Sequence, residues 1–522
     1  MRTSLKVMLS KSEVLTLRKF WSVLFLTYIF ILLLISFSLN WIAANFNGVG
    51  FDEILFHLRM PINGAGSYVK SYIFKVLLPA AGILAEILIA ILFIKVFLDM
   101  KPALRDKLKK VFSPFVAHRI LIGSLIIIIW FSAASYRAQN WFGLFDYLRS
   151  SIQHSSFFDQ EYVDPGSVSI SFPEKKRNLI YIFMESAESS SQDKQNGGLL
   201  ETNLIPEMTE IAKENVSFSQ SGLIEGAAVA PLCGWTMAGV FCESTGLPLK
   251  SYSVIKDSEK KFMPGVTALG DILEKEGYTN IFMCGSEAEF GGREKYFLDH
   301  GDYRILDYNE SLMEGRIPDD YKVSWGFEDQ KLYEWAKDEL LELSVSGQPF
   351  NLTMLTVDTH AQDGYVCDLC GNDYTDQYKN VWSCASRQVD EFISWCQKQD
   401  FYENTTIVIA GDHCSMQTDF YEGYDFKMDT GEHERKVYNA FINPDAEVIN
   451  SGAETNRLFT TLDLFPSTLA ALGCKIEGNR LGLGTNLFSG EKTLSEQYGY
   501  DYLFQEIRKQ SATYNKLMLV DE

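Results

Sequence analysis

Three long apolar runs stand near the start of the chain. Trp21–Ala44 contains no charged residue and is long enough to cross a lipid bilayer. Val76–Leu98, with Glu86 and Lys95 in its sequence, is a second predicted span, and Ile120–Tyr136 is a shorter third. No small-residue cleavage site follows the first run, so we expect it to remain as an anchor. Glu86 has two interpretations, a functional carboxylate in the membrane or a polar contact between helices.

Beyond these runs, short apolar segments alternate with amphipathic ones. Asn178–Met184 is continuously apolar after its first residue, which is typical of a central parallel strand. The predicted strands are Asn178–Met184, Asn280–Cys284, Phe350–Val357 and Thr405–Ala410, and the predicted helices are Val266–Glu276, Trp325–Leu343, Ser386–Lys398 and Thr460–Leu472. This alternation predicts an α/β fold with a doubly wound, mostly parallel sheet.

The charge of the chain changes sign near residue 140, where the long apolar runs also end. The first 140 residues carry 16 Lys+Arg and 6 Asp+Glu, and the remainder carries 31 and 62. The acidic remainder argues against nucleic-acid binding. The loop Lys101–Arg119 is strongly basic, whereas Asn45–Ser71 is balanced, so the positive-inside rule places everything after the third span outside the cytoplasm. We expect a membrane domain over 1–140, a juxtamembrane linker over 141–177 and an extracytoplasmic domain over 178–522.

All nine cysteines lie in the acidic part, between Cys233 and Cys474. An oxidising compartment permits disulfides there. Cys367, Cys370 and Cys384 cluster in sequence, but no fourth zinc ligand stands at a suitable spacing. We therefore expect Cys384 to pair with Cys370 or Cys367 in preference to a zinc site.

Acidic and histidine side chains follow the predicted strands. Glu185 comes directly after the first strand, and Asp412 and His413 follow Thr405–Ala410 after a single glycine. In open α/β sheets the carboxyl ends of strands form the ligand site. Carboxylates with one imidazole suit a divalent cation, so these three residues are candidate metal ligands.

Thr236 lies in a Pro- and Gly-broken loop, near the start of a helix of small residues. Its hydroxyl has two interpretations: an N-cap of that helix, which is the commoner case, or a nucleophile favoured by the helix dipole and a nearby metal. Cys233 is a rival nucleophile in the same loop.

Two further side chains are candidates for contact with a substrate. His360 closes a third strand and can donate to a phosphate oxygen or protonate a leaving group, or it is an ordinary loop histidine. Trp325 precedes Gly326, and the pair forms either a pocket wall or simple packing.

Together these residues resemble the sulfatase-like branch of the alkaline phosphatase superfamily. Within it the chain is most similar to membrane phosphoglycerol transferases that modify periplasmic glucans, which are relatives of lipoteichoic acid synthase. The motifs that carry the resemblance are Tyr181–Ser186, Thr236–Gly239, Cys242–Leu249, Pro264–Asp271, Ser324–Phe327, Leu355–His360, Asp412-His413, Leu481–Gly484 and, in the membrane part, Asn63–Gly66. The cysteine-x-proline-x-arginine signature of true sulfatases is missing around Cys233.

The resemblance implies Glu185, Thr236, Asp412 and His413 as ligands of a divalent metal ion, manganese or magnesium first and zinc as an alternative. It implies Thr236 as the nucleophile and His360 as a phosphate contact. Arg293 and Arg435 are added as candidate substrate-binding cations, with surface solvation as the alternative for both.

The reaction that the resemblance implies is transfer of phosphoglycerol from phosphatidylglycerol to a glucan hydroxyl, through a phosphoglycerol-threonine intermediate, at a bacterial plasma membrane. The alternatives are a lipoteichoic-acid-type polymerase, a phosphoethanolamine transferase and an inactive scaffold. Intact Glu185, Thr236, Asp412 and His413 argue against the inactive scaffold.

Overall fold

The computed structural model describes residues 11–46, 48–61, 65–108, 119–250, 261–421, 435–449 and 454–518. Asn63 and Gly64 of the membrane motif lie outside these residues. The chain forms two compact units. The first consists of Met1–Asn47 and Gly66–Leu144, and the second of Gly48–Ala65 and Phe145–Glu522.

The first unit is helical. It contains α1 (Lys11–Asn45), a continuous helical stretch of α3 (Gly66–Tyr72), a π-turn (Ile73–Leu77) and α4 (Leu78–Met100), and α6 (Arg119–Phe142). Val23–Asn45 and Gly66–Met100 are long and apolar enough to cross a membrane and bury almost none of their residues inside the protein. These two segments therefore match the first and second predicted spans, and the third predicted span lies in α6.

The centre of the second unit is a six-stranded sheet in the order β4-β3-β5-β2-β6-β7. Its strands are β2 (Asn178–Met184), β3 (Thr279–Cys284), β4 (Arg304–Leu306), β5 (Phe350–Leu355), β6 (Thr405–Gly411) and β7 (Asn439–Ile442). All neighbouring pairs are parallel except β6 and β7. The mostly parallel α/β sheet predicted from the sequence is confirmed.

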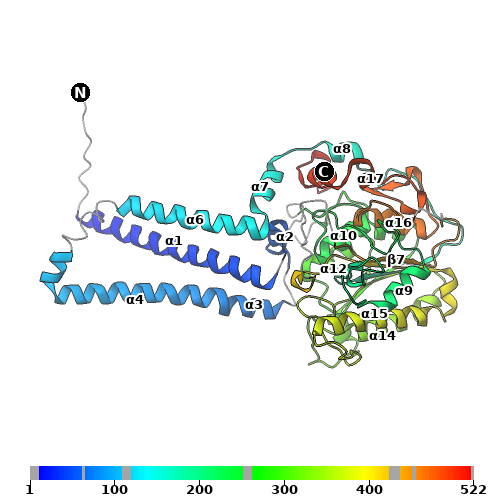
Figure 1. The fold of residues 1–522 in the computed structure, drawn as a ribbon, viewed down its shortest axis with the longest axis horizontal. Helices are drawn as coiled ribbons and strands as arrows, with labels where there is room; N and C mark the ends of the chain where they lie inside the picture. Colours follow the sequence, from blue (N-terminus) through cyan, green and yellow to red (C-terminus); the bar gives the residue numbers. More distant parts are fainter. Residues whose placement is uncertain are drawn as a thin grey trace. The chain divides into compact units, whose positions relative to one another are not determined.

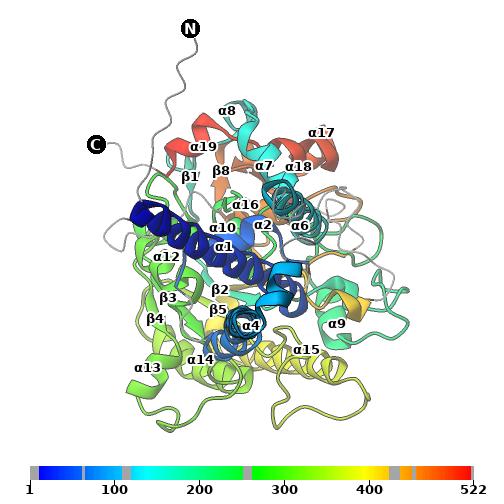
Figure 2. The same cartoon turned by 90° about the vertical axis from the view of Figure 1, so that its left-hand side faces the viewer.

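Helices cover both faces of this sheet, because side chains of each buried strand alternate between two cores. Leu179, Tyr181 and Phe183 of β2 enter one core, and the intervening residues enter the other. Figures 1 and 2 show α10 (Thr236–Thr245) and α16 (Leu464–Ala471) on one side, with α14 (Asp329–Ser344) and α15 (Gln377–Cys396) on the other. The first core also receives α11 (Leu269–Lys275) and α12 (Arg293–Asp299), and the second α9 (Pro206–Glu214) and α13 (Tyr308–Met313).

All four predicted helices start at other residues in the structure, and for two of them a local contact gives the reason. Helix α14 begins at Asp329 because Val323 and Gly326 close a tight turn with paired backbone hydrogen bonds, which leaves Trp325 outside the helix. Helix α15 begins at Gln377, earlier than predicted, because the Asp376 carboxylate accepts hydrogen bonds from the backbone N–H groups of Tyr378 and Lys379.

From Phe145 onward, the segment expected to be a linker belongs to the second unit. It includes α7 (Leu144–Ile152), α8 (Phe157–Glu161) and β1 (Ile170–Ser171), and Phe157 and Phe158 are buried in the core. The C-terminal part adds β8 (Lys475–Ile476), β9 (Arg480–Leu481), β10 (Gly484–Thr485), α17 (Leu494–Tyr498), α18 (Tyr500–Arg508) and α19 (Ala512–Lys516).

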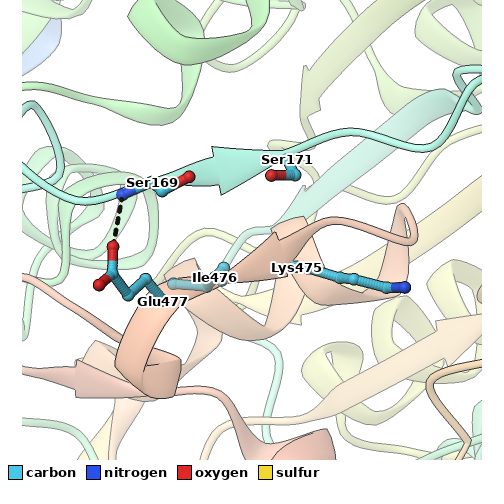
Figure 3. A pocket seen from close by; sticks show the side chains of 5 residues that line it. All are labelled: Ser169, Ser171, Lys475, Ile476 and Glu477. Atoms are coloured by element: carbon cyan, nitrogen blue, oxygen red, sulfur yellow. Dashed lines mark hydrogen bonds between the residues drawn. The ribbon is translucent and has the colours of Figure 1, made fainter.

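Strands β1 and β8 pair antiparallel beside a hollow of about 340 Å³ (Figure 3). It is lined by Ser169, Ser171, Lys475, Ile476 and Glu477, and the Glu477 carboxylate accepts a hydrogen bond from the Ser169 backbone. None of these residues was a candidate from the sequence, and we assign the hollow no role.

No disulfide forms among the nine cysteines, all of which lie in the described part of the chain. The Cys384 Sγ is 3.8 Å from that of Cys367, far beyond the roughly 2.05 Å of an S–S bond. The predicted disulfide at Cys384 is therefore wrong for this structure. Cys414, which follows His413 directly, is a buried free thiol.

Candidate active site

The strands that precede His360, Glu185 and Asp412 are neighbours in the sheet, in the order β5-β2-β6. They are parallel, so their carboxyl ends meet at one edge. Met184 pairs with Gly411 in the register, which places Glu185 beside Asp412. The predicted convergence of these residues follows directly from strand order.

Glu185, Asp412 and His413 form a buried cluster whose ligand atoms all lie within 4.8 Å of one another. The His413 Nε2 is 3.4 Å from Glu185 Oε1 and 3.5 Å from Asp412 Oδ2. Asp412 Oδ2 is buried and has no hydrogen-bond partner among the described residues. An orphaned carboxylate oxygen inside a carboxylate and imidazole cluster fits a bound divalent cation.

Backbone hydrogen bonds hold these side chains in place. Asp412 Oδ1 accepts from the backbone N–H groups of Ser186 (2.8 Å) and His413 (2.9 Å). The His413 Nδ1 lies 2.9 Å from the Cys414 carbonyl oxygen, so Nδ1 donates there and Nε2 is left to face the cluster. Ser186 Oγ donates to Glu185 Oε1 over 2.8 Å.

The cluster is electrostatically coupled. Burial opposes a charge on His413, but the Asp412 and Glu185 carboxylates outweigh it and raise its pKa to about 10. Burial likewise opposes a charge on Glu185, and the His413 and His360 imidazoles outweigh it and lower its pKa to about 2. Burial, with Glu185, raises the pKa of Asp412 to about 7. The carboxyl groups of Glu185 and Asp412 thus both face the His413 imidazole. A divalent cation bound among the three side chains would supply the positive charge that the two carboxyl groups favour.

Thr236 reaches this cluster from the first turn of α10. Its Oγ1 is 3.3 Å from Glu185 Oε2 and 3.3 Å from His413 Nε2. The N-cap of α10 is Trp235, so the N-cap interpretation of Thr236 is wrong. Gly239 permits this approach, because a Cβ at that position would lie 1.9 Å from the Asp412 carbonyl oxygen.

His360 lies at the edge of the same site, next to a wall of aromatic rings. Its imidazole is 4.9 Å from the Trp325 ring, which is 5.2 Å from that of Phe290. The His360 imidazole is one of the groups that lower the pKa of the Glu185 carboxyl, which indicates that the two side chains face the same site. Trp325 therefore forms part of a wall beside His360.

Arg293 and Arg435 have structural partners. Arg293 is 5% exposed and donates to Phe290 O, Glu287 O and Ser286 Oγ in its own loop. Arg435 is 1% exposed, forms a two-pronged ion pair with Glu188 and lies over the Tyr421 ring. These contacts hold loops around the site and do not support the predicted roles of the two arginines in substrate binding.

The thiol of Cys233, the alternative nucleophile, faces the hydrophobic core and the Pro231 carbonyl instead of the Glu185, Asp412 and His413 cluster. Its side chain is fully buried in the hydrophobic core, and its thiol donates to the Pro231 carbonyl oxygen over 3.6 Å. Thr236 is therefore the hydroxyl or thiol of this loop that contacts the cluster.

Sequence reasoning missed α2 (Phe51–His57), which belongs to the second unit although it lies between the first two predicted spans. Phe56 is fully buried with its ring 5.4 Å from that of Trp235, next to Thr236. The His57 ring is 5.8 Å from that of Phe290, which extends the aromatic wall.

Glu53 and His57 stand one helical turn apart on α2. Each interacts electrostatically with a histidine of the site, Glu53 with His413 and His57 with His360. Burial, against the effect of His413, raises the pKa of Glu53 to about 8. Burial and the charge of His360 lower the pKa of His57 to about 4. The sequence did contain a signal for this helix. Glu53 and His57 stand at an i, i+4 spacing in the loop between the first two predicted spans, which is typical of paired side chains on one helix face.

Comparisons with known proteins place the chain in a family. The profile of the family described as Sulfatase matches residues 177–474. Phosphoglycerol transferase I of Xanthomonas axonopodis pv. citri is 27% identical over 402 residues, covering 75% of this chain and 52% of that protein. Phosphoglycerol transferase I of Escherichia fergusonii is 32% identical over 253 residues, covering 47% of this chain and 32% of that protein. The chain thus spans about half or less of the length of these relatives.

Solved structures with a similar arrangement include two bacterial proteins. The lipooligosaccharide phosphoethanolamine transferase A (EptA) of Neisseria meningitidis has a TM-score of 0.47 and 14% identity, covering 86% of this chain and 84% of that chain. The lipoteichoic acid synthase LtaP of Listeria monocytogenes has a TM-score of 0.46 and 19% identity, covering 62% and 79%.

Proposed function

Because this chain belongs to the sulfatase family, we propose that it is a membrane-anchored transferase that moves phosphoglycerol from phosphatidylglycerol to a glycan hydroxyl. The observation that carries the proposal is the position of Thr236. Its hydroxyl contacts Glu185 and His413 instead of capping its helix. A hydroxyl on a metal-ligand cluster is the arrangement expected of an activated nucleophile.

Glu185, Asp412 and His413 would hold a divalent cation together with the Thr236 oxygen. The carboxylate oxygens favour manganese or magnesium, and the imidazole also admits zinc. When bound, such an ion supplies positive charge that favours the threonine alkoxide and offsets the charge of the phosphodiester.

The residues of the chain then divide the reaction into two displacements. Thr236 Oγ1 forms a bond to phosphorus while the bond from phosphorus to the diacylglycerol oxygen breaks, and the threonine proton ends on that oxygen. An acceptor hydroxyl next attacks the same phosphorus, and its proton returns to Thr236 as the threonine ester breaks. His360, at the edge of the site, is positioned to donate to a phosphate oxygen or to the leaving oxygen.

The membrane helices support a lipid as the donor, since they would keep the site near lipid headgroups and raise their effective concentration. The curated relatives are named phosphoglycerol transferase I. A periplasmic glucan is the proposed acceptor because the sequence resembles the phosphoglycerol transferases that modify such glucans. The competing reactions are polymerisation of glycerolphosphate and transfer of phosphoethanolamine.

The test is to reconstitute the full chain with manganese in vesicles of headgroup-labelled phosphatidylglycerol, with and without a soluble β-glucan. Label on the glucan, and label on the Thr236 peptide when the acceptor is omitted, are the expected results. Label that enters only a lipid-linked polymer would assign the polymerase reaction. Transfer that occurs only from phosphatidylethanolamine vesicles would assign the phosphoethanolamine transferase reaction.

Thr202→Ala is the matched control, because Thr202 is exposed and lies outside the site. It should label and transfer like the unchanged protein. If no phospholipid donor labels Thr236 while the cluster binds manganese normally, the proposed transfer reaction is wrong.

A further inference from the structure

We propose that Cys367, Cys370 and Cys384 bind a zinc ion, at a site separate from the Glu185, Asp412 and His413 cluster. Cys367 and Cys370 lie in the loop that leads from His360 to α15, and Cys384 lies on α15 itself. The ion would tie the loop to the helix.

The sulfur atoms have the spacing of metal ligands. The Cys367 Sγ is 3.7 Å from that of Cys370 and 3.8 Å from that of Cys384. Sulfurs placed tetrahedrally around zinc, with Zn–S of about 2.3 Å, are about 3.8 Å apart. The three sulfurs all lie within 4.8 Å of one another, so a single ion can contact all of them.

Metal binds the thiolate form of cysteine, and one neighbouring side chain donates toward two of the three sulfurs. Gln388, one turn beyond Cys384 on α15, points its Nε2 at Cys384 Sγ (3.4 Å) and Cys367 Sγ (3.7 Å). Hydrogen-bond donation to a sulfur stabilises its anion. Arg387 on the same helix donates to the Leu369 carbonyl oxygen, between the two loop cysteines.

A buried carboxyl without a hydrogen-bond partner lies near the loop cysteines. Asp358 is 3% exposed, and its two carboxylate oxygens have no hydrogen-bond partner among the described residues. Burial, then Asp329 and then Cys367 raise the pKa of Asp358. A cation bound among the sulfurs would place positive charge near this carboxyl.

The donor set selects the kind of metal. Among the described residues, no fourth Cys, His, Asp or Glu joins the group, so the fourth position is open to water. Three thiolates favour zinc over manganese and magnesium, whereas the oxygen-rich catalytic cluster accepts all of these ions. The two sites can therefore be loaded and removed independently.

The experiment measures bound metal in the full chain, purified in detergent without reductant and incubated with zinc and manganese. We expect one thiolate-bound zinc per chain, in addition to the metal of the catalytic cluster. Cobalt substituted for zinc should show thiolate charge-transfer absorption. Cys384→Ser should lose this absorption and the zinc, while Asp412→Asn should keep both and lose the other ion.

Cys396→Ala is the matched control, because Cys396 is a buried thiol on the same helix and outside the group. If Cys384→Ser does not fold, Cys370→Ser replaces it, since Cys370 is partly exposed. An intramolecular disulfide between two of the three cysteines in the purified protein would overturn the proposal. So would a cobalt spectrum that Cys370→Ser leaves unchanged.

Discussion

Thr236 differs from an ordinary helix-start threonine in the direction of its hydroxyl. Trp235 occupies the N-cap without a side-chain hydrogen bond, and the Thr236 hydroxyl faces Glu185 and His413. Loss of this hydroxyl therefore removes a group of the site and leaves the helix start unchanged. Substitution of this residue should therefore affect the transfer rate much more than the free energy of unfolding.

Thr236→Ala should lower the transfer rate by on the order of 10³-fold or more, because a nucleophile has no substitute. Its free energy of unfolding should fall by less than about 1 kcal/mol. Thr236→Ser should keep part of the activity because the hydroxyl remains. Transfer assays and thermal unfolding check both effects, and a near-normal rate in Thr236→Ala would refute the nucleophile assignment.

Arg435 is the opposite case, a charged residue whose contribution is to stability. Its ion pair with Glu188 is fully buried, so Arg435→Met leaves a carboxylate without its partner and should cost about 3–5 kcal/mol. Lys194→Met breaks an exposed pair with Glu201 and should cost less than about 1 kcal/mol. Denaturant unfolding compares the two, and equal costs would contradict the structural role of Arg435.

At the scale of elements, the site depends on which strands are neighbours and on one unexpected helix. β5, β2 and β6 bring His360, Glu185 and Asp412 to one edge. Helix α2 adds Phe56 against Trp235, and the Met60 side chain lies where a Cβ on Gly292 would stand. We therefore regard α2 as part of the catalytic unit.

Phe56→Ala should reduce transfer about tenfold or more, because the cavity it leaves loosens Trp235 and the start of α10. Leu58→Ala is the matched control, since Leu58 caps the same helix and is 72% exposed. Rates measured at saturating donor distinguish the two variants. Equal activity of both would show that α2 does not support the site.

The whole molecule places a constraint on membrane topology. Gly48–Ala65 and Phe145–Glu522 form one compact unit, so they lie on the same side of the membrane. The chain between them must then cross an even number of times. Gly66–Met100 is one candidate crossing, and α6, which contains the third predicted span, would have to be the other. The third span itself stays a prediction.

A reporter fused at Glu522 should be active only outside the cytoplasm, and one inserted after Lys107 only inside, because the Lys101–Arg119 loop is basic. A reporter inserted after Leu58 should behave like the one at Glu522. Paired alkaline phosphatase and fluorescent protein fusions provide the measurement. A cytoplasmic Glu522 would contradict both the topology and the lipid donor.

The sequence by itself predicted two segments long and apolar enough to span a membrane, the mostly parallel α/β sheet, and the convergence of Glu185, Asp412 and His413 at its edge. These could be predicted because hydropathy and strand periodicity are local, and because a polar residue directly after a buried strand must lie at the edge of the sheet.

Only the tertiary structure decided the partners of side chains far apart in sequence. Arg435 meets Glu188 across 247 positions, Phe56 meets Trp235, and three cysteines converge without forming a bond. The free energy of such contacts depends on distance and burial, which local sequence patterns do not encode. For the same reason the hydroxyl of Thr236 could be assigned to the metal-ligand cluster, and not to an N-cap, only once α10 had been placed against Asp412.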